Sequence, residues 1–197
     1  MEKDNIQNQL IQIGRKIVKE KGAAALTARK LAEASNCSVG AIYSQFANMD
    51  NYILVQNYLT LDELSQRLIT ANKTGNPFND INNLLQLFVD FIFENNNLWY
   101  MLYNFHLNNT RRFSFYYLRK VASLIKMVNT YMEKIVPNME APERLVSTQV
   151  LWLTLFSMSP FLTNESLEGF SKINKSSICR LILDTYIAGL TVLENQK

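Results

Sequence analysis

Apolar residues recur at intervals of three and four along most of this chain, and no segment alternates apolar with polar residues over any length. Stripes of this kind lie within residues 6–17, 81–92, 117–135 and 178–190. Because an α-helix repeats about every 3.6 residues, this spacing favours helices over half-buried strands. The chain is therefore expected to be all-α, with about nine helices. The expected helices are residues 4–21, 27–34, 38–45, 48–73, 79–95, 97–107, 111–136, 141–159 and 175–195.

The lengths of these helices suggest how the chain is organised. The shorter ones lie close to the N-terminus, and longer, more apolar helices follow. This pattern predicts a small N-terminal module at residues 1–50, carried on a larger helical body at residues 51–197. A chain of 197 residues is long enough to bury a hydrophobic core in such a body.

Charge and hydropathy restrict the location and the partners of the chain. The net charge is only +3, so any surface for an anionic partner has to be a local patch. The N-terminus lacks the apolar segment of a signal peptide. The longest mostly apolar stretch, residues 150–162, is shorter than the about 20 residues that span a bilayer. We expect a cytoplasmic protein without a membrane partner.

Residues 26–46 combine two helix starts with a tight turn. Thr27 and Ser38 are residues that cap helix N-termini, because their hydroxyl oxygens accept a hydrogen bond from a free backbone N–H. Asn36, between them, tolerates the left-handed conformation of a turn. Two short helices joined by a turn of three or four residues form a helix-turn-helix.

The same run resembles the signature of the TetR family of transcriptional regulators. Gly40 is followed by the pattern Tyr43-x-x-Phe46, and the motif-level resemblance covers about residues 6 to 60. The chain departs from the family pattern at four positions. Asn36 replaces the usual Gly, Cys37 a Val, Gln45 a common His, and Met49 a Lys that neutralises a phosphate in family members.

The resemblance implies a three-helix DNA-binding head, with the second helix of the motif in the major groove. It also implies that Tyr43 bonds a phosphate, while Gln45 is suited to an adenine edge or a phosphate. Basic residues between positions 15 and 30 would neutralise further phosphates, although each could equally belong to a solvated face. The expected DNA-binding residues are Thr27, Ala28, Arg29, Ser38, Val39, Gly40, Ala41, Tyr43, Ser44 and Gln45.

The remainder of the chain is rich in aromatic residues and methionine. In family members this body holds a ligand pocket and the dimer interface, although ordinary core packing accounts equally for such residues. The expected ligand-binding residues are Trp99, Tyr103, His106, Arg111, Tyr116, Trp152 and Phe156. The expected dimer-interface residues are Trp152, Ile182, Tyr186, Gly189 and Leu193, with the last two long helices packing against their symmetry mates.

Catalytic and metal-binding signatures are missing from the sequence. His106 is the single histidine, and the cysteines Cys37 and Cys179 show no metal-ligand spacing. Phosphate loops, nucleophile elbows and paired-carboxylate motifs are also missing. We therefore expect no enzyme, no metal and no cofactor.

Together these features predict a homodimeric, ligand-responsive repressor that binds a pseudo-palindromic operator in double-stranded DNA. Its effector is expected to be a small apolar or amphipathic molecule. The alternative is an all-α protein for small-molecule binding or protein interaction, with a vestigial DNA-binding head.

Overall fold

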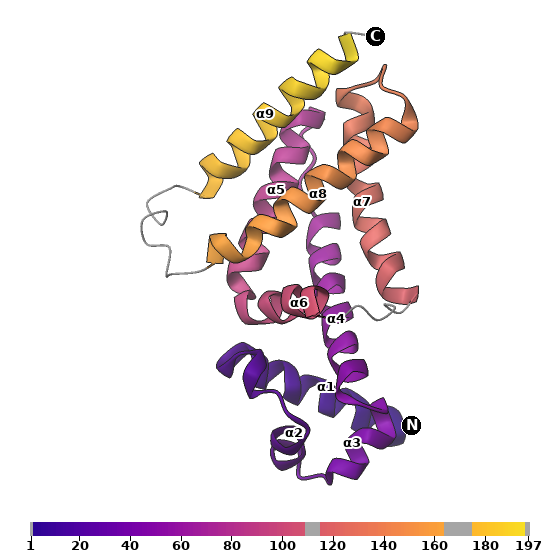
Figure 1. The fold of residues 1–197 in the computed structure, drawn as a ribbon, viewed down its shortest axis with the longest axis vertical. Coiled ribbons are helices and arrows are strands. Elements are labelled where there is room, and N and C mark those ends of the chain that lie inside the picture. Colours follow the sequence, from indigo (N-terminus) through magenta and orange to yellow (C-terminus); the bar gives the residue numbers. More distant parts are fainter. Residues whose placement is uncertain (1, 109–114, 164–174, 196–197) are drawn as a thin grey trace. The chain divides into compact units, whose positions relative to one another are not determined.

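The computed structural model describes residues 2–108, 115–163 and 175–195, and these residues form nine α-helices and one short 3-10 helix, without a strand (Figure 1). The all-α prediction is therefore confirmed. The α-helices are α1 (Glu2–Lys21), α2 (Ala28–Ser35), α3 (Val39–Phe46), α4 (Met49–Ile69), α5 (Pro77–Glu94), α6 (Asn96–Asn108), α7 (Phe115–Ile135), α8 (Ala141–Thr163) and α9 (Lys175–Asn195). The 3-10 helix η1 is Ala23–Ala25.

The chain divides into two compact units. The first comprises Met1–Glu63 and Asn95–Leu118, and the second comprises Leu64–Glu94 and Arg119–Lys197. The helix-turn-helix lies in the first unit, together with α6 and most of α4. The expected functional division at residue 50 stays a prediction.

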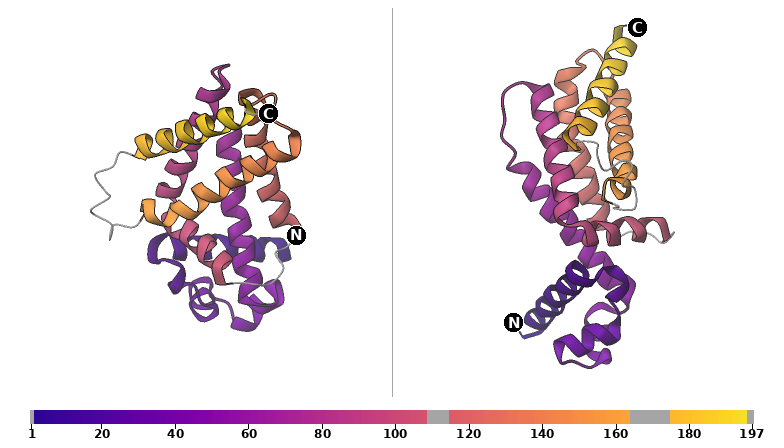
Figure 2. Two further views of the ribbon diagram at one scale, coloured as in Figure 1. Left: turned by 45° about the horizontal axis from the view of Figure 1, so that its top comes forward. Right: turned by 90° about the vertical axis from the view of Figure 1, so that its left-hand side faces the viewer.

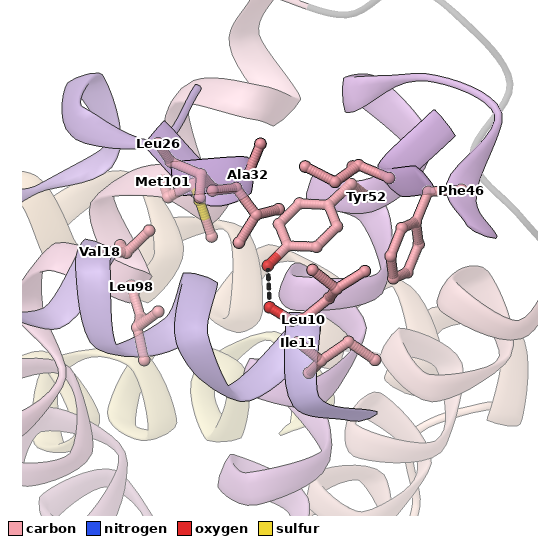
Figure 3. Packing of buried hydrophobic residues seen from close by; sticks show 11 residues of the cluster. Leu10, Ile11, Val18, Leu26, Ala32, Phe46, Tyr52, Leu98 and Met101 are labelled. Carbon is pink, nitrogen blue, oxygen red and sulfur yellow. Dashed lines mark hydrogen bonds between the residues drawn. The ribbon is translucent and has the colours of Figure 1, made fainter. Parts of the chain in front are cut away.

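The first unit is organised around the apolar side of α1. This helix packs against α2, η1 and α6. Leu10 and Val18 of α1 are almost completely buried (Figure 3). Leu31 of α2 and Ile42 of α3 are also fully buried and belong to the same cluster. Burying a large aliphatic side chain contributes about 1.5–3 kcal/mol, so this cluster fixes the positions of α2 and α3 against α1.

The second unit contains α5, most of α7, α8 and α9, and α5 packs against both α8 and α9 (Figures 1 and 2). The apolar stripe of α5 forms the centre of this packing, because Ile81, Leu84, Phe88 and Ile92 are all buried. The spacing of three and four that predicted the helix therefore also predicted its buried face.

Most helix boundaries differ from the sequence-based expectation by one or more residues, and three of these differences have a local cause. α4 ends at Ile69 rather than 73, where its buried stripe stops and the Thr70 hydroxyl donates to the Arg67 carbonyl instead. α5 begins two residues early, at Pro77, because proline suits the first helical position and the Asn76 side chain accepts from the N–H groups of Phe78 and Asn79.

The third difference concerns Pro160, which was expected to end its helix at residue 159. Instead α8 continues through Pro160 to Thr163. Proline cannot donate to the carbonyl four residues earlier, which belongs to Phe156. The Ser159 hydroxyl donates to that carbonyl oxygen at 2.6 Å, and this bond compensates for the missing backbone donor.

Candidate nucleic-acid interface

The two helix starts of the motif have the geometry that the sequence predicted. The Thr27 hydroxyl oxygen accepts from the Lys30 N–H at 3.2 Å, and the Ser38 hydroxyl oxygen accepts from the Ala41 N–H at 3.1 Å. Asn36 adopts the left-handed conformation, with φ 54° and ψ 38°. Two capped helices joined by a tight turn are therefore confirmed as a helix-turn-helix.

Helix α3 has a buried side and an exposed side. Ile42 and Phe46 are buried, and the ring of Phe46 meets that of Tyr52 edge-on, with ring centroids 4.8 Å apart. On the opposite side, Val39 is 37% exposed and Tyr43 is 42% exposed. Because its inner side is fixed by packing, α3 presents its outer side on a rigid support.

The predicted DNA-binding residues lie on the surface of this unit. Thr27 and Arg29 are exposed at the start of α2, and Ser38 lies exposed before α3. Val39, Gly40, Tyr43 and Ser44 are exposed along α3, whereas Ala28, Ala41 and Gln45 are half-buried. Their role in binding DNA stays a prediction.

Gly40, in the first turn of α3, leaves the backbone uncovered because glycine has no side chain. A Cβ atom built at this position would meet only the Ser38 hydroxyl oxygen, at an ordinary contact distance of 3.7 Å. Glycine within a helix costs about 1 kcal/mol relative to alanine. The fold of the protein therefore does not require glycine here, and the residue leaves room for close approach from outside.

Among the described residues of this unit, the exposed positive charges lie on α1 and α2 rather than on α3 itself. Arg29 and Lys30 are exposed on the first turn of α2, and α3 contains neither acidic nor basic residues. On α1, Lys16, Lys19 and Lys21 are also exposed, with Lys16 at 4.0 Å from Glu20. An ion pair between exposed side chains is weak, so Lys16 stays available to an anion.

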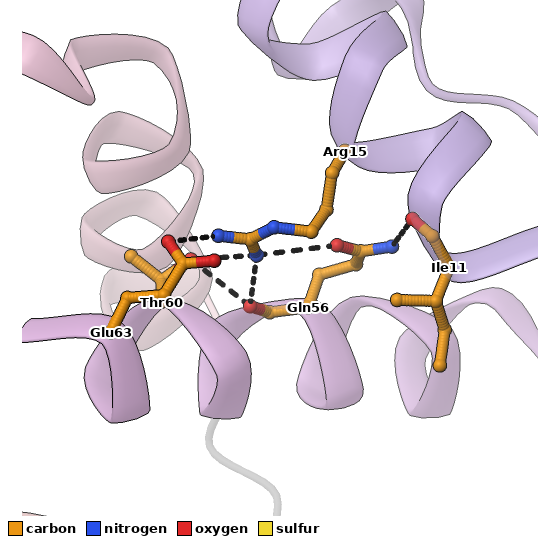
Figure 4. Close-up of polar contacts among 5 residues, drawn as sticks. All are labelled: Ile11, Arg15, Gln56, Thr60 and Glu63. Carbon is orange, nitrogen blue, oxygen red and sulfur yellow. Dashed lines mark hydrogen bonds and ion pairs between the residues drawn. The ribbon is translucent and has the colours of Figure 1, made fainter. Parts of the chain in front are cut away.

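Arg15 does not belong to this basic surface, contrary to the sequence-based expectation. Its side chain is buried and reaches from α1 to α4, where it forms an ion pair with Glu63 at 2.6 Å. It also donates to the Gln56 carbonyl oxygen at 3.1 Å and to the Thr60 hydroxyl at 3.2 Å (Figure 4). A buried cation needs such partners, and these contacts remove Arg15 from phosphate binding.

Tyr52 extends the same set of contacts between α1 and α4. Its phenol O–H donates to the Leu10 carbonyl oxygen at 2.8 Å, and the Gln56 amide nitrogen donates to the phenol oxygen at 2.9 Å. Burial raises the pKa of Tyr52 to about 12, although the Gln56 hydrogen bond and the charge of Arg15 act in the opposite direction. We call Arg15, Tyr52, Gln56, Thr60 and Glu63 the α1–α4 polar cluster.

Sequence reasoning missed this cluster, although the sequence contained a signal for it. Gln56, Thr60 and Glu63 follow one another at intervals of four and three, which places them on one side of α4. The oxygen atoms of such a polar stripe need a hydrogen-bond donor when they pack beside the apolar residues of α1. Arg15 is that donor.

Met49 occupies the position where the resemblance leads one to expect a phosphate-binding lysine. Its side chain is partly buried and packs against the apolar cluster of the first unit. The preceding residue, Asn48, caps α4 by accepting from the Asn51 N–H at 2.8 Å. At this position the chain therefore has an apolar side chain that packs against the core, in place of a cation.

The predicted ligand-binding residues are distributed over both units. Trp99 is buried and Tyr103 half-buried in the first unit, where Tyr116 is 71% exposed. Trp152 and Phe156 are half-buried on α8, in the second unit. The side chain of His106 and the whole of Arg111 lie outside the described residues.

Trp152 lies beside a narrow apolar cavity of the second unit. The cavity has free space of about 20 Å³, and the Trp152 and Phe88 rings meet with centroids 5.7 Å apart. Space of this size holds about one water molecule. The remaining lining residues are Leu68, Leu84, Leu85, Phe88, Ile125, Val128, Thr148, Leu151 and Leu155.

The other predicted dimer residues share an open groove between α8 and α9. The groove measures about 490 Å³ and is lined almost entirely by apolar atoms, with Ile182, Tyr186, Gly189 and Leu193 among its residues. The Tyr186 O–H donates to the Ser147 carbonyl oxygen at 2.5 Å, which ties α9 to α8. Trp152 lies at the cavity rather than in this groove. Dimer formation through this surface stays a prediction.

The described residues show no sign of two other kinds of site. Within residues 2–108, 115–163 and 175–195, no cluster of His, Cys, Asp or Glu has the arrangement of a metal site. No helix in this part of the chain is long and apolar enough to cross a membrane.

The capped motif and the exposed side of α3 define the class of helix-turn-helix proteins with an all-helical body. Residues 10–52 match the model of the bacterial regulatory proteins of the tetR family. This match covers the N-terminal module of the chain, and it agrees with the resemblance in the sequence. No curated protein matches the sequence.

Solved structures share the fold at low sequence identity. A tetR-family transcriptional regulator from Streptomyces coelicolor is 14% identical with a TM-score of 0.70, covering 97% of this chain and 82% of its own. BioQ from Mycobacterium smegmatis is 13% identical with a TM-score of 0.69, covering 94% and 97%. The TetR family transcriptional regulator PfmR from Thermus thermophilus is 15% identical with a TM-score of 0.63, covering 91% and 97%.

Proposed function

We propose that this chain is a transcriptional repressor that binds double-stranded DNA by inserting α3 into the major groove. One observation carries the proposal, namely the exposed side of α3. Gly40 sits there with room for a Cβ atom, although alanine would suit the helix better. Glycine lowers the stability of the helix at this position, but it lets the atoms of a partner approach the backbone closely.

The flanking groups suit the phosphates on either side of a groove. The first two N–H groups of α2 and of α3 have no carbonyl partner within their helices, so they are available to anions. The third N–H of each helix is already bonded to the cap hydroxyl of Thr27 or Ser38. Arg29 and Lys30 add positive charge beside them, and the exposed Tyr43 hydroxyl can donate to a phosphate. These contacts would fix the orientation of α3, while the side chains on its outer face meet the base edges.

The apolar groove between α8 and α9 supports the proposal of a homodimer. Leu153 of α8 and Leu181, Val192 and Leu193 of α9 are each more than half exposed. Of these residues, Leu181 and Leu193 line the groove together with Gly189, and a Cβ atom added to Gly189 would meet no other atom within 4 Å. A second copy that packs the same two helices across a two-fold axis would cover these residues, and it would match a pseudo-palindromic operator.

A small apolar or amphipathic effector is proposed to act at the cavity beside Trp152. The cavity is too small for such a molecule, so binding would favour a state in which α5, α7 and α8 have moved apart. Leu68, near the end of α4, lines the cavity, and the α1–α4 polar cluster lies nearer the start of this helix. Since α4 is continuous, movement at Leu68 would be transmitted to the residues that hold α1.

The test is selection of the protein's own binding sequence from random double-stranded DNA, followed by fluorescence anisotropy. We expect an inverted repeat to be enriched and its affinity to fall steeply with salt. Tyr43→Ala should weaken binding to every sequence, and Gln45→Ala should weaken it or change the base preference. Tyr100→Ala, which removes a similarly exposed tyrosine on α6, serves as the control. Failure to enrich any sequence would favour the alternative of a vestigial head.

A further inference from the structure

The exposed side of α3 offers few hydrogen-bonding groups to a base pair. Val39 is 37% exposed in the first turn, and Gly40 has no side chain. The Ser44 hydroxyl donates to the Ala41 carbonyl oxygen at 2.7 Å, so its proton is already engaged within the helix. The charged groups that read guanine and cytosine, namely guanidinium, ammonium and carboxylate, do not occur on α3.

What the first turn of α3 does offer is methyl groups. Val39 carries two of them at the tip of the helix, and Ala41 adds a third, half-buried one. Among the bases of DNA, thymine alone presents a methyl group in the major groove. The bare backbone at Gly40 lets this turn come close enough for methyl groups to touch.

We propose that Val39 and Ala41 select A·T base pairs in the operator by packing against thymine methyl groups. The proposal rests on the proposed function, because it names the chemistry by which the α3 surface recognises its DNA. The charges support DNA as the occupant of this apolar surface. Arg29 and Lys30 are exposed on α2, which packs against α3, and α3 itself contributes no charge that would repel a phosphate.

The decisive experiment removes single methyl groups from the DNA. In the selected binding sequence, each thymine of one half-site is replaced in turn by deoxyuridine, which lacks the methyl group and keeps every hydrogen-bonding group. We expect one or two positions per half-site at which affinity falls about fourfold, the equivalent of the about 0.8 kcal/mol for one buried methylene. Deoxyuridine placed outside the half-sites should leave the affinity unchanged.

A double-mutant cycle then assigns the contact to Val39. Val39→Ala should weaken binding to the thymine-containing operator by several-fold, and it should have little further effect on DNA that carries deoxyuridine at the partnered position. Val39 is an exposed first residue of its helix, and alanine is a good helix former, so the variant should fold normally. Circular dichroism and thermal unfolding verify this.

The outcomes separate the proposal from the function on which it rests. Selection of a defined sequence that tolerates deoxyuridine at every thymine would overturn the methyl contact and leave a DNA-binding regulator. Equal losses for Val39→Ala on both DNAs would overturn the role of Val39. If no sequence is selected at all, the proposed function fails, and this inference fails with it.

Discussion

The phenol oxygen of Tyr52 in α4 lies 2.8 Å from the carbonyl oxygen of Leu10 in α1 (Figure 3). The contact is possible because residue 14, one turn further along α1, is glycine. A Cβ atom at that position would lie only 1.8 Å from the Tyr52 hydroxyl oxygen. Gly14 is therefore required by the fold, whereas Gly40 is not.

This contrast gives a pair of matched variants for stability. Gly14→Ala should destabilise the protein by about 1–3 kcal/mol, because the added methyl group displaces the Tyr52 ring or separates α1 from α4. Gly40→Ala should leave the stability unchanged or raise it by up to about 1 kcal/mol. Urea unfolding followed by circular dichroism measures both changes. Equal effects of the two substitutions would contradict the packing described for Tyr52.

Tyr52 should also make the stability depend on pH in the alkaline range. Because burial raises its pKa from 10.0 to about 12, the folded protein holds the phenol proton more tightly than the unfolded chain does. The associated stability is complete below pH 10 and is lost as the pH rises through about 12. Tyr52→Phe should flatten the alkaline decline measured by urea unfolding. Parallel declines in the two proteins would show that another group titrates instead.

The groove between α8 and α9 predicts the effect of a charge on self-association. Leu193→Lys should convert a dimer to a monomer in sedimentation velocity, because the lysine charge would be buried in an apolar interface. Leu118→Lys is the matched control, since Leu118 and Leu193 are both 52% exposed and only Leu193 lines the groove. If Leu193→Lys sediments as the wild type does, this surface is not the dimer interface.

The exposed cations predict how DNA binding responds to salt. Arg29→Ala should reduce the slope of log affinity against log salt concentration by about one, as expected for the loss of one phosphate contact. Arg119→Ala removes an exposed arginine of α7 and should leave the slope as it is in the wild type. Identical slopes for all three proteins would exclude Arg29 from the interface.

Much of the motif could be predicted from the sequence because its determinants are local. Thr27 and Ser38 cap helices, and Asn36 takes a left-handed turn, through atoms only a few residues away. The helical periodicity likewise predicted both α5 and its buried side. Such features depend on residues that are close in the sequence, so they can be predicted from the sequence.

The remaining features depend on partners distant in the sequence. The burial of Arg15 follows from Glu63, 48 residues away, and a charge on an amphipathic helix gives no sign of such a partner. The continuation of α8 through Pro160 depends on the rotamer of Ser159. The aromatic content of the body does not show where each aromatic residue lies. The distribution of these residues over two units could therefore not be predicted.

The central claim is that the exposed side of α3 is built to meet DNA, and Gly40→Ala tests it most directly. Anisotropy with the selected operator should show binding weakened at least about tenfold, because the added methyl group holds α3 away from the base edges. The same variant should be at least as stable as the wild type in urea. Wild-type affinity in the Gly40→Ala protein would contradict the account, because it would mean that DNA does not approach this face closely.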